Sequence, residues 1–139
     1  MELIIGGAYQ GKSRYIRETY PDYTIYDETT VAELERAGAE EKPVLNHFHL
    51  CVKQMLEETA DSAKESKTPP EERIAAWAKN LIERYPDLII ASDEIGSGIV
   101  PIEKQERLWR EVTGRVLCDL AKEAERVVRL TCGISMKLK

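Results

Sequence analysis

Residues Gly6-Gly7-Ala8-Tyr9-Gln10-Gly11-Lys12-Ser13 fill every fixed position of the pattern G-x-x-x-x-G-K-[ST]. The apolar residues 3–5 before this stretch predict a buried strand, and residues 13–19 after it predict a helix. Glycines let the backbone turn tightly, so that successive N–H groups point inward at phosphate oxygens, and the helix N-terminus favours the same anion. The stretch therefore predicts a phosphate-binding loop between a first strand and a first helix.

Two residues of this loop have predicted chemical roles. Lys12 is expected to reach the β- and γ-phosphates of a nucleoside triphosphate, and the Ser13 hydroxyl is expected to bind Mg²⁺. The pattern fits GTP and ATP equally. A simple glycine turn explains the glycines but leaves the adjacent Lys-Ser pair unexplained. The predicted nucleotide contacts are Gly6, Gly7, Ala8, Tyr9, Gln10, Gly11, Lys12 and Ser13.

Length and composition bound the class of protein. The 139 residues predict one domain, residues 1–139, and a net charge of −5 argues against nucleic-acid binding. Because no apolar run approaches the roughly 20 residues of a membrane span, we expect a cytoplasmic protein without a membrane partner. The three cysteines lie far apart in the sequence, which predicts separate buried thiols rather than a zinc site or disulfides.

Strand and helix patterns alternate along the chain, which predicts an α/β fold with a mainly parallel sheet flanked by helices. The expected strands are residues 3–5, 23–26, 43–48, 88–91 and 126–131, with 134–138 as an edge strand. The expected helices are residues 13–19, 29–39, 50–64 and 103–124, and one that begins at 68–71 and ends before residue 85. In helix 103–124, the side chains expected to face inward are Leu108, Val112, Val116, Leu117 and Leu120.

Ligands of such sheets bind beyond the carboxyl ends of the strands. That edge is expected to carry Asp27, Asn46, Asp93 and Glu94 beside the phosphate-binding loop. Asp93 and Glu94 are the predicted catalytic carboxylates, with Asp93 as a ligand of Mg²⁺. The alternative is a solvated acidic loop. Residues 94–101 hold two glycines and a proline, which predicts a shaped loop that closes over a ligand or only connects two elements.

His47 and His49 flank Phe48. On a strand the two imidazoles would share one face, but no third ligand stands at a recognised spacing, so a zinc site is not predicted. Either histidine could contact substrate or act as a nucleophile in nucleotidyl transfer. The alternative is that both are packed or solvated.

Several stretches resemble the bifunctional adenosylcobinamide kinase/adenosylcobinamide-phosphate guanylyltransferase family of cobalamin biosynthesis. Residues 3–14 are similar to the family's opening, in which Gly-Gly-Ala precedes Gly-Lys-Ser-Arg. Residues 93–101, Asp-Glu-Ile-Gly-Ser-Gly-Ile-Val-Pro, resemble its Asn-Glu-Val-Gly-x-Gly-Ile-Val-Pro. Residues 113–116, Thr-Gly-Arg-Val, resemble its Ala-Gly-Arg-Val, and Gly133, Ile134 and Lys137 resemble its C-terminal turn.

The resemblance implies a RecA-like P-loop α/β domain that forms homo-oligomers. It implies phosphoryl transfer from GTP or ATP to the aminopropanol hydroxyl of a corrinoid, adenosylcobinamide, followed by transfer of GMP through a guanylylated histidine. It makes residues 6–13 the phosphate and Mg²⁺ contacts and Glu94 the matched loop acid.

The chain departs from the family pattern at two places, and it is shorter than typical members. Residues 26–42, which correspond to the segment with the guanylylated histidine, contain no histidine. Asn46 stands where the family has an acid, in a Leu-(Glu/Asp)-Cys run. Two hypotheses follow: a kinase-type transferase with a doubtful guanylyltransferase half, or a catalytically degenerate nucleotide-binding or regulatory protein of the same fold.

Overall fold

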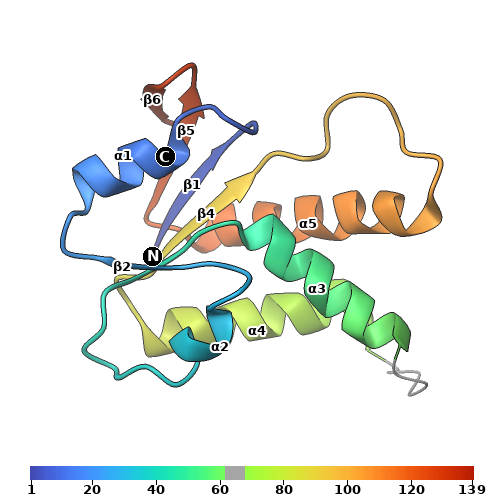
Figure 1. Ribbon diagram of the computed structural model, residues 1–139, viewed down its shortest axis with the longest axis horizontal. Helices are drawn as coiled ribbons and strands as arrows, with labels where there is room; N and C mark the ends of the chain where they lie inside the picture. The colour runs from blue at the N-terminus through green and yellow to red at the C-terminus, as the bar shows by residue number, and fades with distance from the viewer. Residues whose placement is uncertain (62–67) are drawn as a thin grey trace.

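The computed structural model describes residues 1–61 and 68–139, and the strands among them form one sheet in the order β2-β3-β4-β1-β5-β6 (Figure 1). All neighbouring strands pair in parallel except β5 and β6, which are antiparallel. The strands are β1 (Glu2–Gly6), β2 (Thr24–Tyr26), β3 (Pro43–Leu45), β4 (Ile89–Asp93), β5 (Arg126–Thr131) and β6 (Ile134–Lys137). The helices are α1 (Lys12–Thr19), α2 (Val31–Leu34), α3 (Phe48–Asp61), α4 (Pro70–Arg84) and α5 (Lys104–Glu123).

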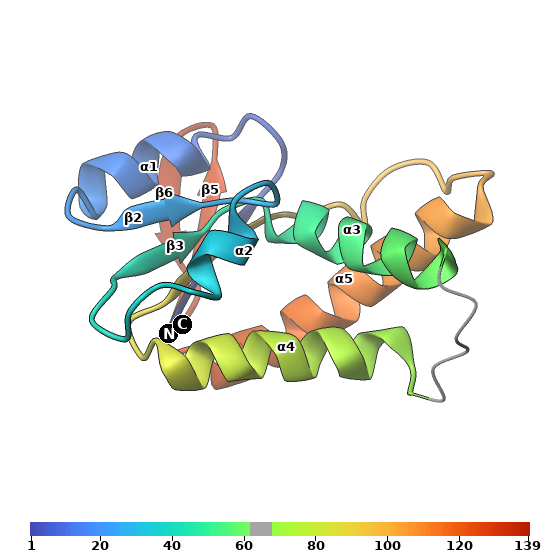
Figure 2. The same cartoon turned by 60° about the horizontal axis from the view of Figure 1, so that its bottom comes forward.

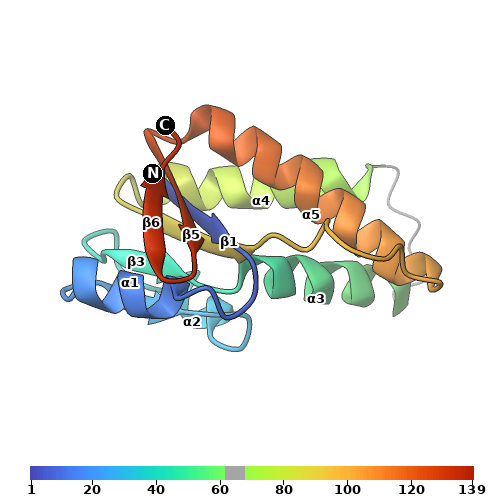
Figure 3. The same ribbon diagram turned by 90° about the horizontal axis from the view of Figure 1, so that it is seen from above.

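The helices cover both faces of the sheet. Helix α1 lies on one face, and α3, α4 and α5 lie on the other, as Figures 2 and 3 show from two directions. Alternate residues of a strand point to opposite faces, so Leu3 packs toward α3, α4 and α5 while Ile4 packs toward Ile16 of α1. The predicted α/β fold with a mainly parallel sheet is therefore confirmed.

Strand β1 lies at the centre of the sheet, between β4 and β5. Because β1, β3 and β4 run parallel, their carboxyl ends lie at the same edge of the sheet. The predicted phosphate-binding loop joins β1 to α1 at this edge. The topology thus brings the loop next to the residues that follow β3 and β4.

Several predicted boundaries differ from the structure. Helix α2 covers only Val31–Leu34 instead of 29–39. It begins later than predicted because an Asp27 carboxylate oxygen accepts the backbone N–H groups of Thr29 and Thr30 and forms a turn before it. Strand β3 ends at Leu45, and α3 begins at Phe48 rather than at residue 50. The predicted end of that helix, residue 64, lies outside the described residues. Strand β4 extends to Asp93.

Some predictions about burial were wrong. Leu108 is exposed, although Val112, Val116 and Leu120 of the same helix are buried. Of the three cysteines only Cys51 is buried, and burial raises the pKa of its thiol to about 12. Cys118 lies on the solvent side of α5, and Cys132 lies in the exposed turn between β5 and β6.

Among the described residues, no helix combines the length and apolar character needed to cross a membrane.

Gly114 lies inside α5, where a Cβ atom would have no heavy atom within 4 Å. Glycine in a helix interior is less favourable than alanine by roughly 0.5–1 kcal/mol, because the unfolded chain loses more freedom. We therefore expect Gly114→Ala to raise the free energy of unfolding by that amount. Thermal unfolding monitored by circular dichroism measures this change, and a lower melting temperature would show that residue 114 does not lie on an open face of the helix.

Candidate nucleotide site

The phosphate-binding loop packs against β5 and the turn that follows it. A Cβ atom on Gly6 would lie 2.5 Å from the carbonyl oxygen of Leu130, so only glycine fits there. Gly11 has a φ of 93°, in the left-handed region, and a Cβ on it would lie 3.2 Å from the Gly133 Cα. Both glycines of the sequence pattern are therefore required by close backbone contacts as well as by the turn itself.

Gln10 ties the loop to the β5–β6 turn. Its side-chain oxygen accepts the backbone N–H of Cys132 at 2.6 Å, and its backbone carbonyl accepts the N–H of Gly133 at 3.0 Å. Tyr9 next to it has a φ of 58° and a fully exposed ring. The loop is thus fixed at Gln10 and presents Tyr9 at its tip.

The Lys12 side chain is buried against the loop that precedes it. Its Nζ donates to the carbonyl oxygens of Gly6 at 3.1 Å and Gly7 at 2.7 Å, and lies 2.6 Å from Oδ1 of Asp93. An ammonium group has three donors. All three are therefore directed at the loop and at the end of β4.

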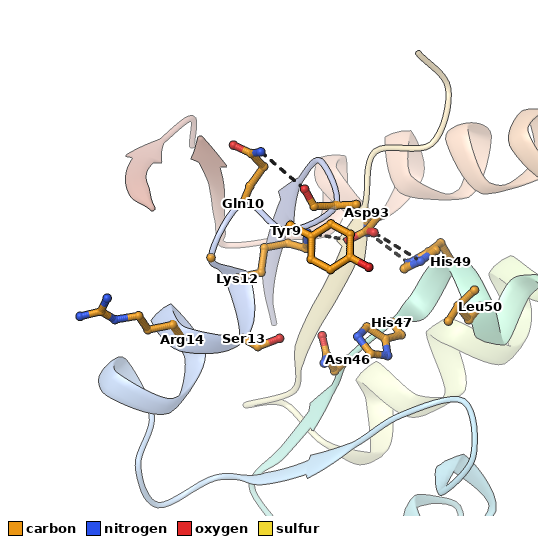
Figure 4. Close-up of a pocket in the computed structure, with 12 residues that line it drawn as sticks. Tyr9, Gln10, Lys12, Ser13, Arg14, Asn46, His47, His49, Leu50 and Asp93 are labelled. Atoms are coloured by element: carbon orange, nitrogen blue, oxygen red, sulfur yellow. Dashed lines mark hydrogen bonds and ion pairs between the residues drawn. The ribbon is translucent and has the colours of Figure 1, made fainter. Parts of the chain in front are cut away.

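A cavity of about 550 Å³ opens at this edge of the sheet, and Figure 4 shows its lining. The side chains come from the loop, from the start of α1, from the β3–α3 junction and from the end of β4. The lining residues are Ala8, Tyr9, Gln10, Gly11, Lys12, Ser13, Arg14, Asn46, His47, His49, Leu50 and Asp93. The predicted loop residues 8–13 and the predicted carboxylate Asp93 thus share one cavity.

Asp93 lies between Lys12 and His49 (Figure 4). One carboxylate oxygen is paired with the Lys12 ammonium, and the other, Oδ2, lies 3.6 Å from Nε2 of His49. The backbone N–H of Asp93 donates to Nδ1 of the same imidazole at 3.2 Å. Both the main chain and the side chain of Asp93 therefore contact His49.

His49 is buried. Burial lowers the pKa of its imidazole below the usual value, and the nearby Asp93 carboxylate only partly opposes this effect. The indole of Trp109 in α5 lies against the ring, with centroids 6.2 Å apart and planes at 25°. Its Nε1–H donates to the His49 carbonyl oxygen at 2.6 Å.

His47 has a different environment. Its φ of 54° lies in the left-handed region and turns the chain from β3 into α3, where its carbonyl accepts the backbone N–H of Leu50 at 2.7 Å. Its side chain is 42% exposed, and its Nδ1 lies 3.1 Å from a carboxylate oxygen of Glu28. The two histidines therefore differ in access: His47 is open to the cavity, while both nitrogens of His49 face Asp93.

Asn46 supplies an unpaired oxygen to the cavity. The residue is buried, and its Oδ1 has no hydrogen-bond partner among the described residues. Figure 4 shows Asn46 and Ser13 turned toward the same space. Carboxylate, amide and hydroxyl oxygens are the ligands that Mg²⁺ prefers, and Mg²⁺ usually takes only one or two from the protein. Asp93, Asn46 and Ser13 therefore fit this ion, although no cluster of three His, Cys, Asp or Glu side chains is placed to hold a metal in residues 1–61 and 68–139.

Two residues predicted at this edge lie outside the cavity. Glu94 pairs with Arg129 of β5 at 2.9 Å, and Asp27 is occupied by the turn before α2. The loop after Glu94 is held to α5, because Arg107 donates to the carbonyl of Pro101 and Arg110 to that of Ile99. Of the two predicted carboxylates, the structure brings only Asp93 to the phosphate-binding loop.

The sequence gives no local signal for three contacts of this site. The Glu28–His47 pair, the two-point contact between His49 and Asp93, and the support of His49 by Trp109 join residues 19, 44 and 60 positions apart. Trp109 in particular is not among the residues of helix 103–124 that were predicted to face inward. These contacts depend on where α3 begins and how α5 crosses it.

A family model described as cobinamide kinase / cobinamide phosphate guanyltransferase (CobU) matches residues 21–138. The chain belongs to the CobU family. The bifunctional adenosylcobalamin biosynthesis protein CobU of Escherichia coli K12 is 28% identical over 180 residues, covering 100% of this chain and 99% of that protein. The protein of the same description from Salmonella typhimurium is 36% identical over 52 residues, covering 37% of this chain and 29% of that protein.

The alignment with the E. coli protein is longer than this chain. The E. coli protein therefore contains segments that have no counterpart in this chain. The family match begins after the phosphate-binding loop, whereas the E. coli alignment includes it. Membership of the CobU family agrees with the resemblance seen in the sequence and supports a kinase/guanyltransferase role in cobalamin biosynthesis.

Proposed function

We propose that the protein binds a nucleoside triphosphate at residues 6–13 and transfers its γ-phosphoryl group to the hydroxyl of a corrinoid such as adenosylcobinamide. One observation carries this proposal: the phosphate-binding loop and the carboxylate of Asp93, the last residue of the neighbouring strand β4, line the same cavity. Membership of the CobU family supplies the substrate class.

The chain's own residues account for the main requirements of this reaction. Backbone N–H groups of the loop and the N-terminus of α1 bind the phosphates, and Lys12 stabilises the charge on the transferred group. Ser13, Asp93 and Asn46 would hold Mg²⁺, which when bound neutralises negative charge between the β- and γ-phosphates. A bond forms from the acceptor oxygen to phosphorus as the bond to the diphosphate breaks, and the hydroxyl proton is released.

The two strand ends beside the loop support an enzyme rather than a degenerate protein. By the resemblance, the family has an acid at the position of Asn46 and an asparagine at the position of Asp93. In this chain the two are exchanged between the neighbouring strands: the amide, Asn46, follows β3, and the acid, Asp93, ends β4. One carboxylate and one amide therefore remain in the cavity. We infer that the acid that organises the metal has moved from the end of β3 to the end of β4.

The kinase reaction is tested with adenosylcobinamide and GTP or ATP labelled at the γ-phosphate, in the presence of Mg²⁺. We expect labelled corrinoid phosphate from at least one nucleotide. Nucleotide binding without transfer to the corrinoid would favour the alternative, a nucleotide-binding protein that lacks this chemistry.

The guanylyltransferase reaction is tested with GTP labelled at the α-phosphate. Nucleotidyl transfer through the enzyme needs an accessible nucleophile, and residues 26–42 offer no histidine. We expect no acid-labile label on the protein. His47, exposed and paired with Glu28, is the histidine that could replace the missing one, so a label that disappears in His47→Ala would contradict this expectation.

A further inference from the structure

We propose that the tip of the β5–β6 hairpin, Cys132 and Gly133, positions the phosphate-binding loop through Gln10. The hairpin tip holds the loop in the conformation that receives phosphate before any nucleotide is bound. Gln10 is therefore a positioning residue as well as part of the cavity lining. This inference rests on the proposed function, because it concerns the affinity of the same loop for a nucleotide.

The hairpin ends in a two-residue turn that leaves two backbone donors outside the strand pairing. Thr131 pairs with Ile134, and Cys132 and Gly133 between them have φ values of 51° and 79°. Positive φ at both central residues is typical of a type I′ turn, whose closing hydrogen bond joins only the two flanking residues. The N–H groups of Cys132 and Gly133 are therefore available to another segment of the chain.

Gln10 accepts both of these donors. Its side-chain Oε1 accepts the Cys132 N–H at 2.6 Å, and its backbone carbonyl accepts the Gly133 N–H at 3.0 Å. The next residue, Gly11, lies so close to the turn that a Cβ on it would be 3.2 Å from the Gly133 Cα. The loop therefore contacts the hairpin tip at the two residues that directly precede Lys12.

The part of the loop that is held in this way has an unfavourable backbone conformation. Tyr9 and Gly11, on the two sides of Gln10, have φ values of 58° and 93°, both in the left-handed region. A residue with a side chain adopts this region only at a cost in free energy, and the exposed ring of Tyr9 makes no packing contact that offsets it. Contacts that order a loop in advance reduce the cost of ordering it on binding. The two hydrogen bonds to Gln10 thus raise the affinity of the loop for a nucleotide.

The hairpin tip can be altered without removing a residue that lines the cavity. Cys132 and Gly133 are not among the described residues that line it. A Cβ on Gly133 would meet no heavy atom within 4 Å, but the φ of 79° disfavours a side chain there, and a β-branched one most. Gly133→Val therefore distorts the turn through backbone strain. Cys132→Asn is the matched control, because asparagine tolerates positive φ and Asn-Gly is a preferred pair in type I′ turns.

The test measures the affinity for GTP and ATP by titration calorimetry, at a temperature at which melting curves show every variant folded. Gln10→Met keeps the length of the side chain and removes its amide oxygen. We expect Gln10→Met and Gly133→Val each to weaken binding by about three- to tenfold, and Cys132→Asn to stay within about twofold of wild type. Because both substitutions break the same contact, the variant that combines them should bind no more than about twofold more weakly than the weaker of the two.

Two results of this titration would overturn the positioning role: single variants that bind as wild type does, or effects that multiply in the combined variant. Multiplied effects would show that Gln10 and the hairpin tip act independently of each other. Wild-type protein that binds neither nucleotide would instead overturn the proposed function.

A second measurement needs no nucleotide. Exchange of backbone amide protons with water, followed by NMR, reports the contact between Gln10 and the hairpin tip directly. We expect the Cys132 amide to exchange at least about threefold faster in Gln10→Met than in wild type. In Gln10→Glu, which keeps an acceptor oxygen, the rate should return toward that of wild type. Equal exchange rates in the three proteins would overturn the proposal, whatever the protein binds.

Discussion

Asp93→Asn is expected to reduce phosphoryl transfer to the corrinoid by about 10²- to 10³-fold. The amide cannot neutralise Lys12 and binds Mg²⁺ more weakly than a carboxylate. The nearby Glu94 cannot compensate, because it is paired with Arg129 outside the cavity. The initial rate with γ-labelled nucleotide measures the effect, and Glu94→Gln is the matched control that should keep a rate within a few-fold of wild type.

A second substitution makes this prediction more specific. If the metal-organising acid moved from β3 to β4, then Asn46→Asp introduced together with Asp93→Asn restores a carboxylate to the other strand end. We expect the double variant to transfer the phosphoryl group at least about tenfold faster than Asp93→Asn alone. A wild-type rate in Asp93→Asn would contradict the role of this carboxylate. A large loss of rate in Glu94→Gln would indicate that Glu94 has this role instead.

Loss of the Asp93 carboxylate also affects folding, and the two effects can be separated. Lys12 is only 7% exposed, so without its partner a buried ammonium would remain. Removing one partner of a buried pair costs several kcal/mol at most sites. The thermal unfolding of each variant must therefore accompany its rate. The rates are compared at a temperature at which every variant is folded. A higher rate in the double variant than in Asp93→Asn then reflects phosphoryl transfer and not stability.

Gly6→Ala is expected to lower the free energy of unfolding by about 3 kcal/mol, because the new Cβ would lie 2.5 Å from the backbone oxygen of Leu130. A backbone atom cannot move aside as the end of a flexible side chain can. Either β1 and β5 separate or the phosphate-binding loop changes its path. The melting temperature should fall by roughly 10 °C, measured by circular dichroism or calorimetry.

Gly7→Ala is the matched control for this substitution. A Cβ on Gly7 would meet only the Gln10 side chain at 3.5 Å, an ordinary contact. The melting temperature of Gly7→Ala should stay within a few degrees of wild type. Equal effects of the two substitutions would show that the loop does not rest on β5 as described, since the difference depends on the Leu130 contact alone.

The fold was largely predictable because its signals are local. A glycine-rich loop between a strand and a helix, followed by alternating strand and helix patterns, predicts a parallel sheet without knowledge of any long-range contact. The edge of the sheet that carries the site follows from the same topology. One boundary differs because of a side-chain contact, since Asp27 forms the turn after which α2 begins.

The site was only partly predictable. Asp93 and Glu94 are adjacent at the end of a strand, and neighbouring side chains of a strand point to opposite sides. Only one of them could face the cavity, and the sequence does not say which. The helix that begins at Phe48, rather than a strand that includes it, gives His47 and His49 their different environments. That difference depends on tertiary contacts with Glu28, Asp93 and Trp109.

Titration of GTP and ATP, with and without Mg²⁺, tests most directly whether the cavity is a nucleotide site. We predict that at least one nucleotide binds, that Mg²⁺ strengthens its binding, and that Lys12→Ala weakens it by about 10- to 100-fold. The absence of binding of both nucleotides to the wild-type protein would contradict the account.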